Sequence, residues 1–282
     1  TNKIERLWKA RSSPIISGTI FDGETYDARM EEELIGWSEY NESFGLNNGW
    51  YFAVWQKHDP EIGVYSQKVP PIIAEEEILY KEKRETPSGT AYDFGETLTG
   101  REVITVKGER GGKVMIKFGE RQNDDGTLNY GSLRNAKNTD VYILSGNGEE
   151  TFAPRFSYRG FRYAFLTVEG NVEILSLKAQ RLRMNFERTG KFVCSDKMLE
   201  DLHNLSLRTE ACNQNGILSD CPQRDERMGW LNDLASRLYQ TCNNFDVSAL
   251  LEKITDDITD TMDENGAIKD TAPYYLGSKI AD

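Results

Sequence analysis

Residues 101–120 alternate between apolar and polar side chains on both sides of a glycine turn. Val103, Thr105 and their neighbours Ile104 and Val106 precede Gly111-Gly112, and a second alternating run, KVMIKF, follows it. A period of two residues is typical of a half-buried strand, and paired glycines accommodate a tight turn. The pattern predicts a β-hairpin centred on this turn.

Three further segments, at 140–146, 161–170 and 172–182, continue the strand pattern with glycine punctuation. Several short strands of this kind are typical of a β-sandwich. Pro70-Pro71 forces extended backbone and is expected to separate two β-modules. We therefore expect residues 1–70 to be the end of an N-terminal β-domain and residues 71–185 to form a β-sandwich domain.

The apolar positions change to a helical period in residues 190–282. Three sets are spaced three and four residues apart, namely Met198, Leu199, Leu202 and Leu205; Leu231, Leu234, Ala235 and Leu238; and Val247, Leu250, Leu251, Ile254, Ile258 and Met262. Ser195 or Asp196 is expected to cap the first helix and Asp246 the last, with Gly266 just past its end. Three helices would form a small bundle or the start of a larger helical ring, and the loop-rich C-terminal residues favour the ring.

Composition narrows the class of protein. The 282 residues are 38% hydrophobic and 11% aromatic, which is typical of a globular protein of about two domains. A net charge of −12 argues against nucleic-acid binding, which needs clustered Lys and Arg. The sequence has no run of ~18 apolar residues, so no membrane span is predicted, and no signal peptide is visible. Because the first residue is Thr1 rather than Met, a leader that has been trimmed stays an open alternative. The compartment stays open, with the cytoplasm slightly favoured.

The cysteines and histidines give no sign of a metal or cofactor. Four cysteines occur without a CxxC pair, and the chain has only two histidines. We expect reduced core thiols, no zinc site and no cofactor.

The densest group of chemically active side chains lies in residues 219–233. Its acids, arginines and tryptophan are Asp220, Arg224, Asp225, Glu226, Arg227, Trp230 and Asp233. Pro222 disfavours helix at Cys221, so an extended segment is expected there, with a helix starting soon after. On that helix Glu226, Trp230 and Asp233, at offsets of about 0, 4 and 7 residues, would share one side.

This combination suits a sugar ligand. Carboxylates bind vicinal hydroxyls, and an indole covers the apolar face of a pyranose ring. Glycoside hydrolysis needs one protonated carboxyl and a second carboxylate, and crowded acids push their pKa values apart. Each residue alone also fits an ordinary role: Arg224, Asp225 and Arg227 as exposed ion pairs, and Trp230 as core. Their occurrence together favours the sugar-binding interpretation.

The sequence SDCPQRDERMGW at 219–230 resembles the signature of the glycoside hydrolase family 78 α-L-rhamnosidases, with Met228 in place of Leu. Further stretches resemble family motifs in the same order, namely GTIFDGETYDAR at 18–29, YDFGETLTGREVITVKG at 92–108 and LRNAKNTDVYILSGNGEETFAPRFSYRGFRY at 133–163. The resemblance covers nearly the whole chain. It implies β-sandwich domains followed by the first helices of an incomplete (α/α)₆ catalytic domain in residues 190–282.

The resemblance also implies a role for each signature residue. Glu226 would be the general acid that protonates the departing glycosidic oxygen. Asp220 and Asp233 would bind sugar hydroxyls and help to keep Glu226 protonated, Trp230 would cover the ring, and Arg224 would contact hydroxyls or orient a carboxylate. The family inverts configuration, so a second carboxylate should activate a water about 6.5–9.5 Å from the acid.

Two departures from the family pattern matter. Asn232 stands where the family has Gly, and the family's helical ring is several times longer than residues 190–282, with the general base on a later helix. We therefore expect a fragment, a truncated product or one chain of a split protein. Little or no turnover is expected from it, and exposed apolar helix faces should promote self-association.

The expected partner is a rhamnose-containing glycoside or polysaccharide. Two alternatives remain open. The chain is either a non-catalytic carbohydrate-binding or assembly module that retains the signature, or a family member that acts on a different deoxy-sugar.

Overall fold

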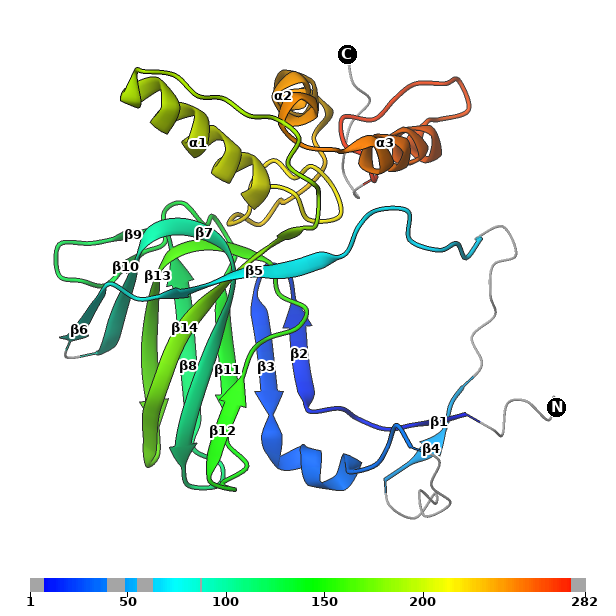
Figure 1. Cartoon of the computed structure of the whole chain (residues 1–282). Helices are drawn as coiled ribbons and strands as arrows, with labels where there is room; N and C mark the ends of the chain where they lie inside the picture. Colours follow the sequence, from blue (N-terminus) through cyan, green and yellow to red (C-terminus); the bar gives the residue numbers. More distant parts are fainter. Residues whose placement is uncertain (1–7, 40–48, 55–62, 87, 275–282) are drawn as a thin grey trace.

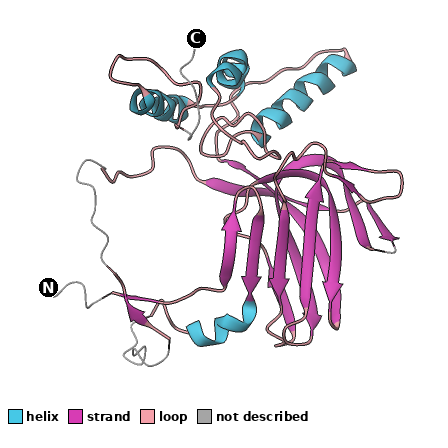
Figure 2. Ribbon diagram, turned by 180° about the vertical axis from the view of Figure 1, so that it is seen from behind, coloured by secondary structure: helices cyan, strands magenta, loops and turns pink. Residues whose placement is uncertain are grey.

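The computed structural model describes residues 8–39, 49–54, 63–86 and 88–274. A curled β-sheet forms one layer, and three helices lie across one end of it (Figure 1; Figure 2). Residues before 190 supply the strands and residues after 195 supply the helices, as the change of period predicts.

Ten strands form the main sheet, in the order β2-β3-β11-β8-β13-β7-β14-β5, with β6 and β12 also paired to β7. Their bounds are β2 Ile15–Thr19, β3 Gly23–Asp27, β5 Ile72–Leu79, β6 Glu82–Thr86, β7 Gly89–Gly108, β8 Lys113–Gly119, β11 Thr139–Ile143, β12 Glu149–Phe152, β13 Arg159–Glu169 and β14 Val172–Met184. Every pairing is antiparallel except that of β3 with β11. Two strands that precede Pro70-Pro71, β2 and β3, therefore join the same sheet as the strands that follow it.

Small elements complete the β-layer. A 3₁₀ helix, η2, spans Ala28–Leu34, and two short pairs join β1 Lys9–Ala10 to β4 Tyr51–Phe52 and β9 Arg121–Gln122 to β10 Leu128–Asn129.

The predicted hairpin around Gly111-Gly112 is wrong in its pairing. Both strands and the turn exist, and Gly111 has the positive φ of 86° that the turn requires. However, β13 lies between β8 and β7, and the second half of β7 pairs with β12 and β14. The turn crosses from one part of the curled sheet to the other. The alternation marks residues that face a shared core, where Val106 and Val114 are both fully buried.

Aromatic rings fill the centre of this core. Phe161 packs edge-on against Phe94, with ring centroids 5.7 Å apart, and lies tilted against Phe118, with ring centroids 4.8 Å apart. All three rings are fully buried. Burial of large aromatic side chains supplies much of the apolar area that stabilises a sheet of this kind.

A group of charged side chains is buried beside the aromatic rings. The Arg159 guanidinium lies 4.5 Å from the centre of the Phe118 ring, and its Nη2 donates to Asp140 Oδ1 at 2.7 Å. Glu102 Oε2 lies 3.9 Å from Arg159 Nη1. Burial, together with the nearby Asp140 charge, raises the pKa of Glu102 well above its ordinary value. The buried group thus contains one close ion pair, between Arg159 and Asp140, and a Glu102 carboxyl whose neutral form is favoured.

The three predicted helices are confirmed as α1 Lys197–Cys212, α2 Leu231–Asn244 and α3 Ser248–Thr261. Asp196 caps α1, because its carboxylate accepts the backbone N–H groups of Met198 and Leu199. A second core joins the helices to the end of the sheet. Its buried members are Met184, Phe186, Leu207, Leu218, Phe245, Val247, Leu250 and Ile254.

Two predicted end signals of the last helix need correction. Val247 directly precedes α3 and has no side-chain cap bond, although Asp246 Oδ1 does accept the Ser248 N–H at 3.2 Å. Gly266 lies five residues beyond the helix end, where it closes a separate turn by donating its N–H to Asp263. Met262 in extended backbone, rather than a glycine, ends α3.

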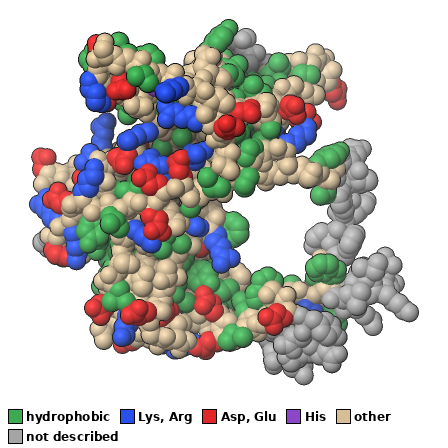
Figure 3. Space-filling model, viewed as in Figure 1, with side chains coloured by type: hydrophobic (Ala, Val, Ile, Leu, Met, Phe, Trp, Pro, Cys, Tyr) green, Lys and Arg blue, Asp and Glu red, His purple; other side chains and the backbone are tan. Residues whose placement is uncertain are grey.

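Ion pairs join the helical layer to the sheet, where basic and acidic side chains intermingle (Figure 3). Glu96 Oε2 of β7 lies 2.9 Å from Arg208 Nη1 of α1 and 3.1 Å from Arg181 Nη2 of β14. Because Arg208 is 64% exposed, these ion pairs add little to the free energy of unfolding. Their main effect is to orient α1 on the sheet.

The apolar stripe of α1 is exposed, which confirms the prediction of uncovered helix faces. Met198 is 64% exposed and Leu205 60%, and Leu199 and Leu202 are exposed as well. All four cysteines are free, but only Cys221 is buried and Cys242 is exposed, so the prediction of core thiols holds for one of them. None of the described helices has the length and apolar character that crossing a membrane requires.

The raised pKa of Glu102 predicts a pH-dependent stability. The folded state keeps the proton above the ordinary value of 4.5 while the unfolded chain loses it, so stability falls as pH rises through this window. Glu102→Gln has no proton to lose. Relative to the parent chain, its free energy of unfolding in urea should therefore be higher at about pH 8 than at about pH 4. The exposed Glu169→Gln serves as control, and a difference from the parent chain that does not change with pH would contradict the account.

Candidate active site

The signature residues form a loop, so the predicted helix through Glu226 is wrong. Residues 220–229 contain no helix, and α2 begins only at Leu231. Asp220 closes the loop: its N–H donates to the Met228 carbonyl at 3.0 Å, and its Oδ1 accepts the Met228 N–H at 2.7 Å. Arg227 has a φ of 51°, a left-handed conformation that a helix excludes. The spacing of Glu226, Trp230 and Asp233 therefore does not place them on one helix face.

The buried Arg227 side chain anchors this loop. It is only 4% exposed, and its guanidinium donates to the carbonyls of Ile20 and Tyr158 and to Asn138 Oδ1, the last at 2.7 Å. Its Nε also donates to the Arg224 carbonyl at 2.6 Å. Burial lowers the pKa of Arg227 to about 10, which still leaves it charged at neutral pH. The interpretation of Arg227 as an exposed ion pair is wrong.

The loop also packs directly on the start of β13. Gly160 donates its N–H to the Pro222 carbonyl at 2.8 Å, and a Cβ at Gly160 would lie 2.6 Å from Pro222 Cγ. Only glycine permits this approach without a shift of the chain. The β-layer therefore positions the signature loop at the base of the helical layer.

Three side chains of the loop meet at one point. The ligand atoms of Asp220, Cys221 and Glu226 all lie within 4.8 Å of one another. Burial raises the pKa of Asp220, and the Glu226 carboxyl that faces it raises that pKa further. The neutral form of the Asp220 carboxyl is thus favoured at this point of the loop.

Burial raises the pKa of the Cys221 thiol to about 12, so the thiol is neutral and unsuited to nucleophilic attack. These three residues are also the described group with metal-ligand spacing. A neutral thiol and the arginines beside Glu226 oppose cation binding there.

Two arginines bind the Glu226 carboxylate. Arg224 Nη1 lies 3.0 Å from Oε1, and Arg134 Nη1 lies 3.1 Å from Oε2. Such an ion pair would count against an acid role if it were buried away from solvent. The Glu226 side chain is 15% exposed, whereas Arg224 and Arg134 are 42% and 53% exposed, so a partly buried carboxylate is paired with two arginines that reach solvent. Both contacts have the length of charge-assisted hydrogen bonds to a carboxylate.

The remaining predicted residues lie apart from this group. Trp230 precedes α2, is partly buried, and forms a backbone bridge with Thr271. Asp233 is exposed in the first turn of α2 and is not part of the group at Asp220 and Glu226. Of the residues predicted from the sequence, the structure therefore brings together Asp220, Arg224 and Glu226, and it adds Arg134, which was not predicted.

Family models match three consecutive parts of the chain. They describe an alpha-L-rhamnosidase N-terminal domain at residues 3–76, a bacterial alpha-L-rhamnosidase concanavalin-like domain at 83–184, and a bacterial alpha-L-rhamnosidase 6 hairpin glycosidase domain at 187–281. The chain belongs to the α-L-rhamnosidases of glycoside hydrolase family 78. The resemblance read from the signature is thereby confirmed.

Named α-L-rhamnosidases share both sequence and fold with the chain. A Streptomyces avermitilis α-L-rhamnosidase is 33% identical over 279 residues, which is 97% of this chain and 26% of the relative. The structure of the α-L-rhamnosidase from Dictyoglumus thermophilum is 33% identical with a TM-score of 0.89, over 99% of this chain and 31% of that one. A Streptomyces avermitilis α-L-rhamnosidase solved with L-rhamnose gives a TM-score of 0.87 at 30% identity, over 97% of this chain and 26% of that one.

The chain spans about a quarter of the length of the curated α-L-rhamnosidases it matches. Within that span, the predicted fold class is confirmed: a curled β-sheet precedes three helices that match the start of the six-hairpin glycosidase domain.

Arg227 and Arg224 differ sharply in burial, and this predicts different effects of the same substitution. Arg227→Met leaves several buried acceptors unpaired and should lower the free energy of unfolding by about 3–5 kcal/mol. Arg224→Met removes an exposed pair and should cost under about 1 kcal/mol. Urea unfolding monitored by tryptophan fluorescence measures both. Equal losses for the two variants would show that Arg227 does not anchor the loop.

Proposed function

We propose that the chain carries the acid side of an inverting α-L-rhamnosidase site, formed around Glu226 and Asp220. The observation that carries this proposal is the pairing of these two carboxyls on a loop fixed by Arg227. Glycoside hydrolysis needs a carboxyl placed to donate a proton to the departing oxygen, and this pair of acids on a fixed loop supplies a candidate for that role. The substrate class is a terminal α-L-rhamnoside of a glycoside or polysaccharide.

In the proposed reaction Glu226 donates its proton to the glycosidic oxygen as the C–O bond to rhamnose breaks. A water attacks the anomeric carbon from the opposite face and passes its proton to a second carboxylate, so the sugar is released with inverted configuration. Arg224 and Arg134 then stabilise the Glu226 carboxylate, from which they lie about 3 Å in the free site. Asp220, Trp230 and Asp233 are proposed to contact the sugar.

The division into residues 1–70, 71–185 and 190–282 also remains our proposal. The pairing of β3 with β11 ties strands of the first part to the second, and the signature loop is held by Ile20 of the first part and Tyr158 of the second. The first two parts would thus act as a scaffold for the third.

L-Rhamnose binding by the 282-residue chain tests the sugar-contacting residues. Isothermal titration calorimetry should give binding that Asp220→Asn and Trp230→Ala each weaken by about tenfold, the value of one lost hydrogen bond to charge or one lost aromatic contact. Asp225→Asn is the matched control: it lies in the same loop but bonds to Asn135 at 2.7 Å, and it should bind as the parent does. Equal binding by all four proteins would refute the proposed contacts.

Turnover provides a separate test. The resemblance assigns the general base to a later helix, so the 282-residue chain should release little or no nitrophenol from 4-nitrophenyl α-L-rhamnoside. The measurement is the absorbance at alkaline pH after prolonged incubation, with Glu226→Gln as the background. Clear hydrolysis by the parent chain that is lost in Glu226→Gln would show that these residues already contain a complete acid and base.

A further inference from the structure

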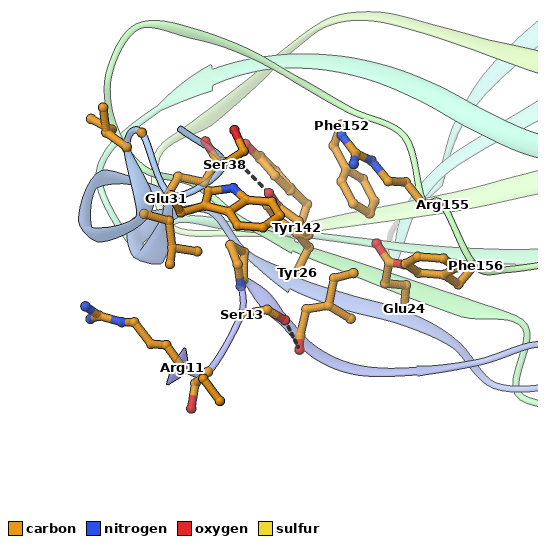
Figure 4. A pocket seen from close by; sticks show the side chains of 18 of the residues that line it. Arg11, Ser13, Glu24, Tyr26, Glu31, Ser38, Tyr142, Phe152, Arg155 and Phe156 are labelled. Carbon is orange, nitrogen blue, oxygen red and sulfur yellow. Dashed lines mark hydrogen bonds between the residues drawn. The ribbon is translucent and has the colours of Figure 1, made fainter. Parts of the chain in front are cut away.

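A cavity of about 860 Å³ lies at the N-terminal edge of the sheet, and no residue of the signature loop lines it (Figure 4). Its floor is formed by β3, β11 and β12, and η2 and the segment after β12 form its sides. A volume of this size is within the range of small-molecule sites in proteins.

Aromatic rings dominate the floor of the cavity. Tyr26 stacks on Tyr142 with ring centroids 5.9 Å apart, and Phe152 lies 4.9 Å from Tyr142 and 5.7 Å from Tyr26. Two more rings at the rim are left open to solvent, Phe156 at 68% and Trp37 at 63% exposure. Flat apolar faces thus line the cavity below and beside its opening.

One buried polar atom in this cavity has no partner. Glu24 is 2% exposed and lines the cavity beside Phe156 (Figure 4), where its carboxyl accepts the backbone N–H groups of Arg155 and Phe156. Its Oε2 is buried without a hydrogen bond to any described residue. Burial and the nearby Asp140 charge raise the pKa of Glu24, which favours the neutral carboxyl. A neutral carboxyl both donates and accepts, as does a sugar hydroxyl.

The charges around the cavity favour a neutral ligand. Three acidic and three basic side chains line it, so neither sign dominates. The Tyr26 hydroxyl is already occupied, because it donates to Glu31 Oε1 at 2.5 Å. Glu24 Oε2, which is buried without a hydrogen bond to a described residue, is available to a ligand.

We propose that this cavity is a second, non-catalytic sugar-binding site that takes a neutral pyranoside ring. Phe156 and Trp37 cover the C–H face of the ring, and Glu24 Oε2 bonds to a ring hydroxyl. The site is independent of the proposed rhamnosidase function, since it shares no residue with the signature loop. It would hold a glycan chain on the β-layer while the loop engages another part of it.

Saturation-transfer NMR and calorimetry on the full 282-residue chain test the proposal. The probes are the methyl glycosides of α-L-rhamnose, β-D-glucose and β-D-galactose. To silence the signature loop, all measurements use the Asp220→Asn/Trp230→Ala background. We expect at least one glycoside to bind, and Phe156→Ala and Trp37→Ala each to weaken it by about tenfold.

Matched variants separate this site from general loss of structure. Trp8→Ala removes a ring that is 72% exposed but does not line the cavity, and it should bind as the background does. Glu24→Met removes the unpartnered oxygen and should abolish binding. Because it also removes the acceptor of two backbone N–H groups, the Phe156 and Trp37 variants decide the question if it does not fold. No binding by any of the three glycosides, or binding that survives Phe156→Ala and Trp37→Ala, would overturn the proposal.

Discussion

The hydrogen bonds from the Arg227 guanidinium to three segments distant in the sequence fix the geometry of the signature loop. Its acceptors come from Ile20, Asn138 and Tyr158, which belong to the strands or their connections, whereas Arg227 itself lies just before the helical layer. A buried guanidinium without these acceptors would remain charged without compensation. The β-layer and the loop must therefore fold together, and the position of Glu226 follows from the same contacts. This constraint gives the β-sheet a direct part in shaping the signature loop.

The local pattern of apolar residues predicted the elements well and their partners poorly. The alternation around Gly111-Gly112 correctly marks β7 and β8, but β13, which separates them, comes about forty residues later in the chain. Pairing is decided by the long-range fit of the curled sheet, which no local window contains. The helices were predicted correctly, because the three- and four-residue spacing of apolar positions is a local property of the sequence. The first of them also has a local N-cap, Asp196.

In the candidate site, too, contacts between residues close in sequence were predicted and long-range contacts were not. Asp220, Arg224 and Glu226 are close in sequence, and the structure brings them together. Arg134 reaches Glu226 from about ninety residues away, and the burial of Arg227 depends on acceptors elsewhere, so neither role was visible in the sequence. The predicted helix failed because the left-handed Arg227 and the Asp220–Met228 closure make a loop of the segment. Asp233 follows on α2 and lies outside the group formed by the loop.

The central claim is that this loop presents Glu226 to the glycosidic oxygen of a rhamnoside. The most direct measurement is a crystal structure of the chain with L-rhamnose bound. The account predicts an ordered sugar whose anomeric oxygen lies within about 3 Å of a Glu226 carboxyl oxygen, in place of or beside Arg224. A sugar ordered at the loop with its anomeric oxygen turned away from Glu226, and with both arginines still paired to that carboxylate, would contradict it.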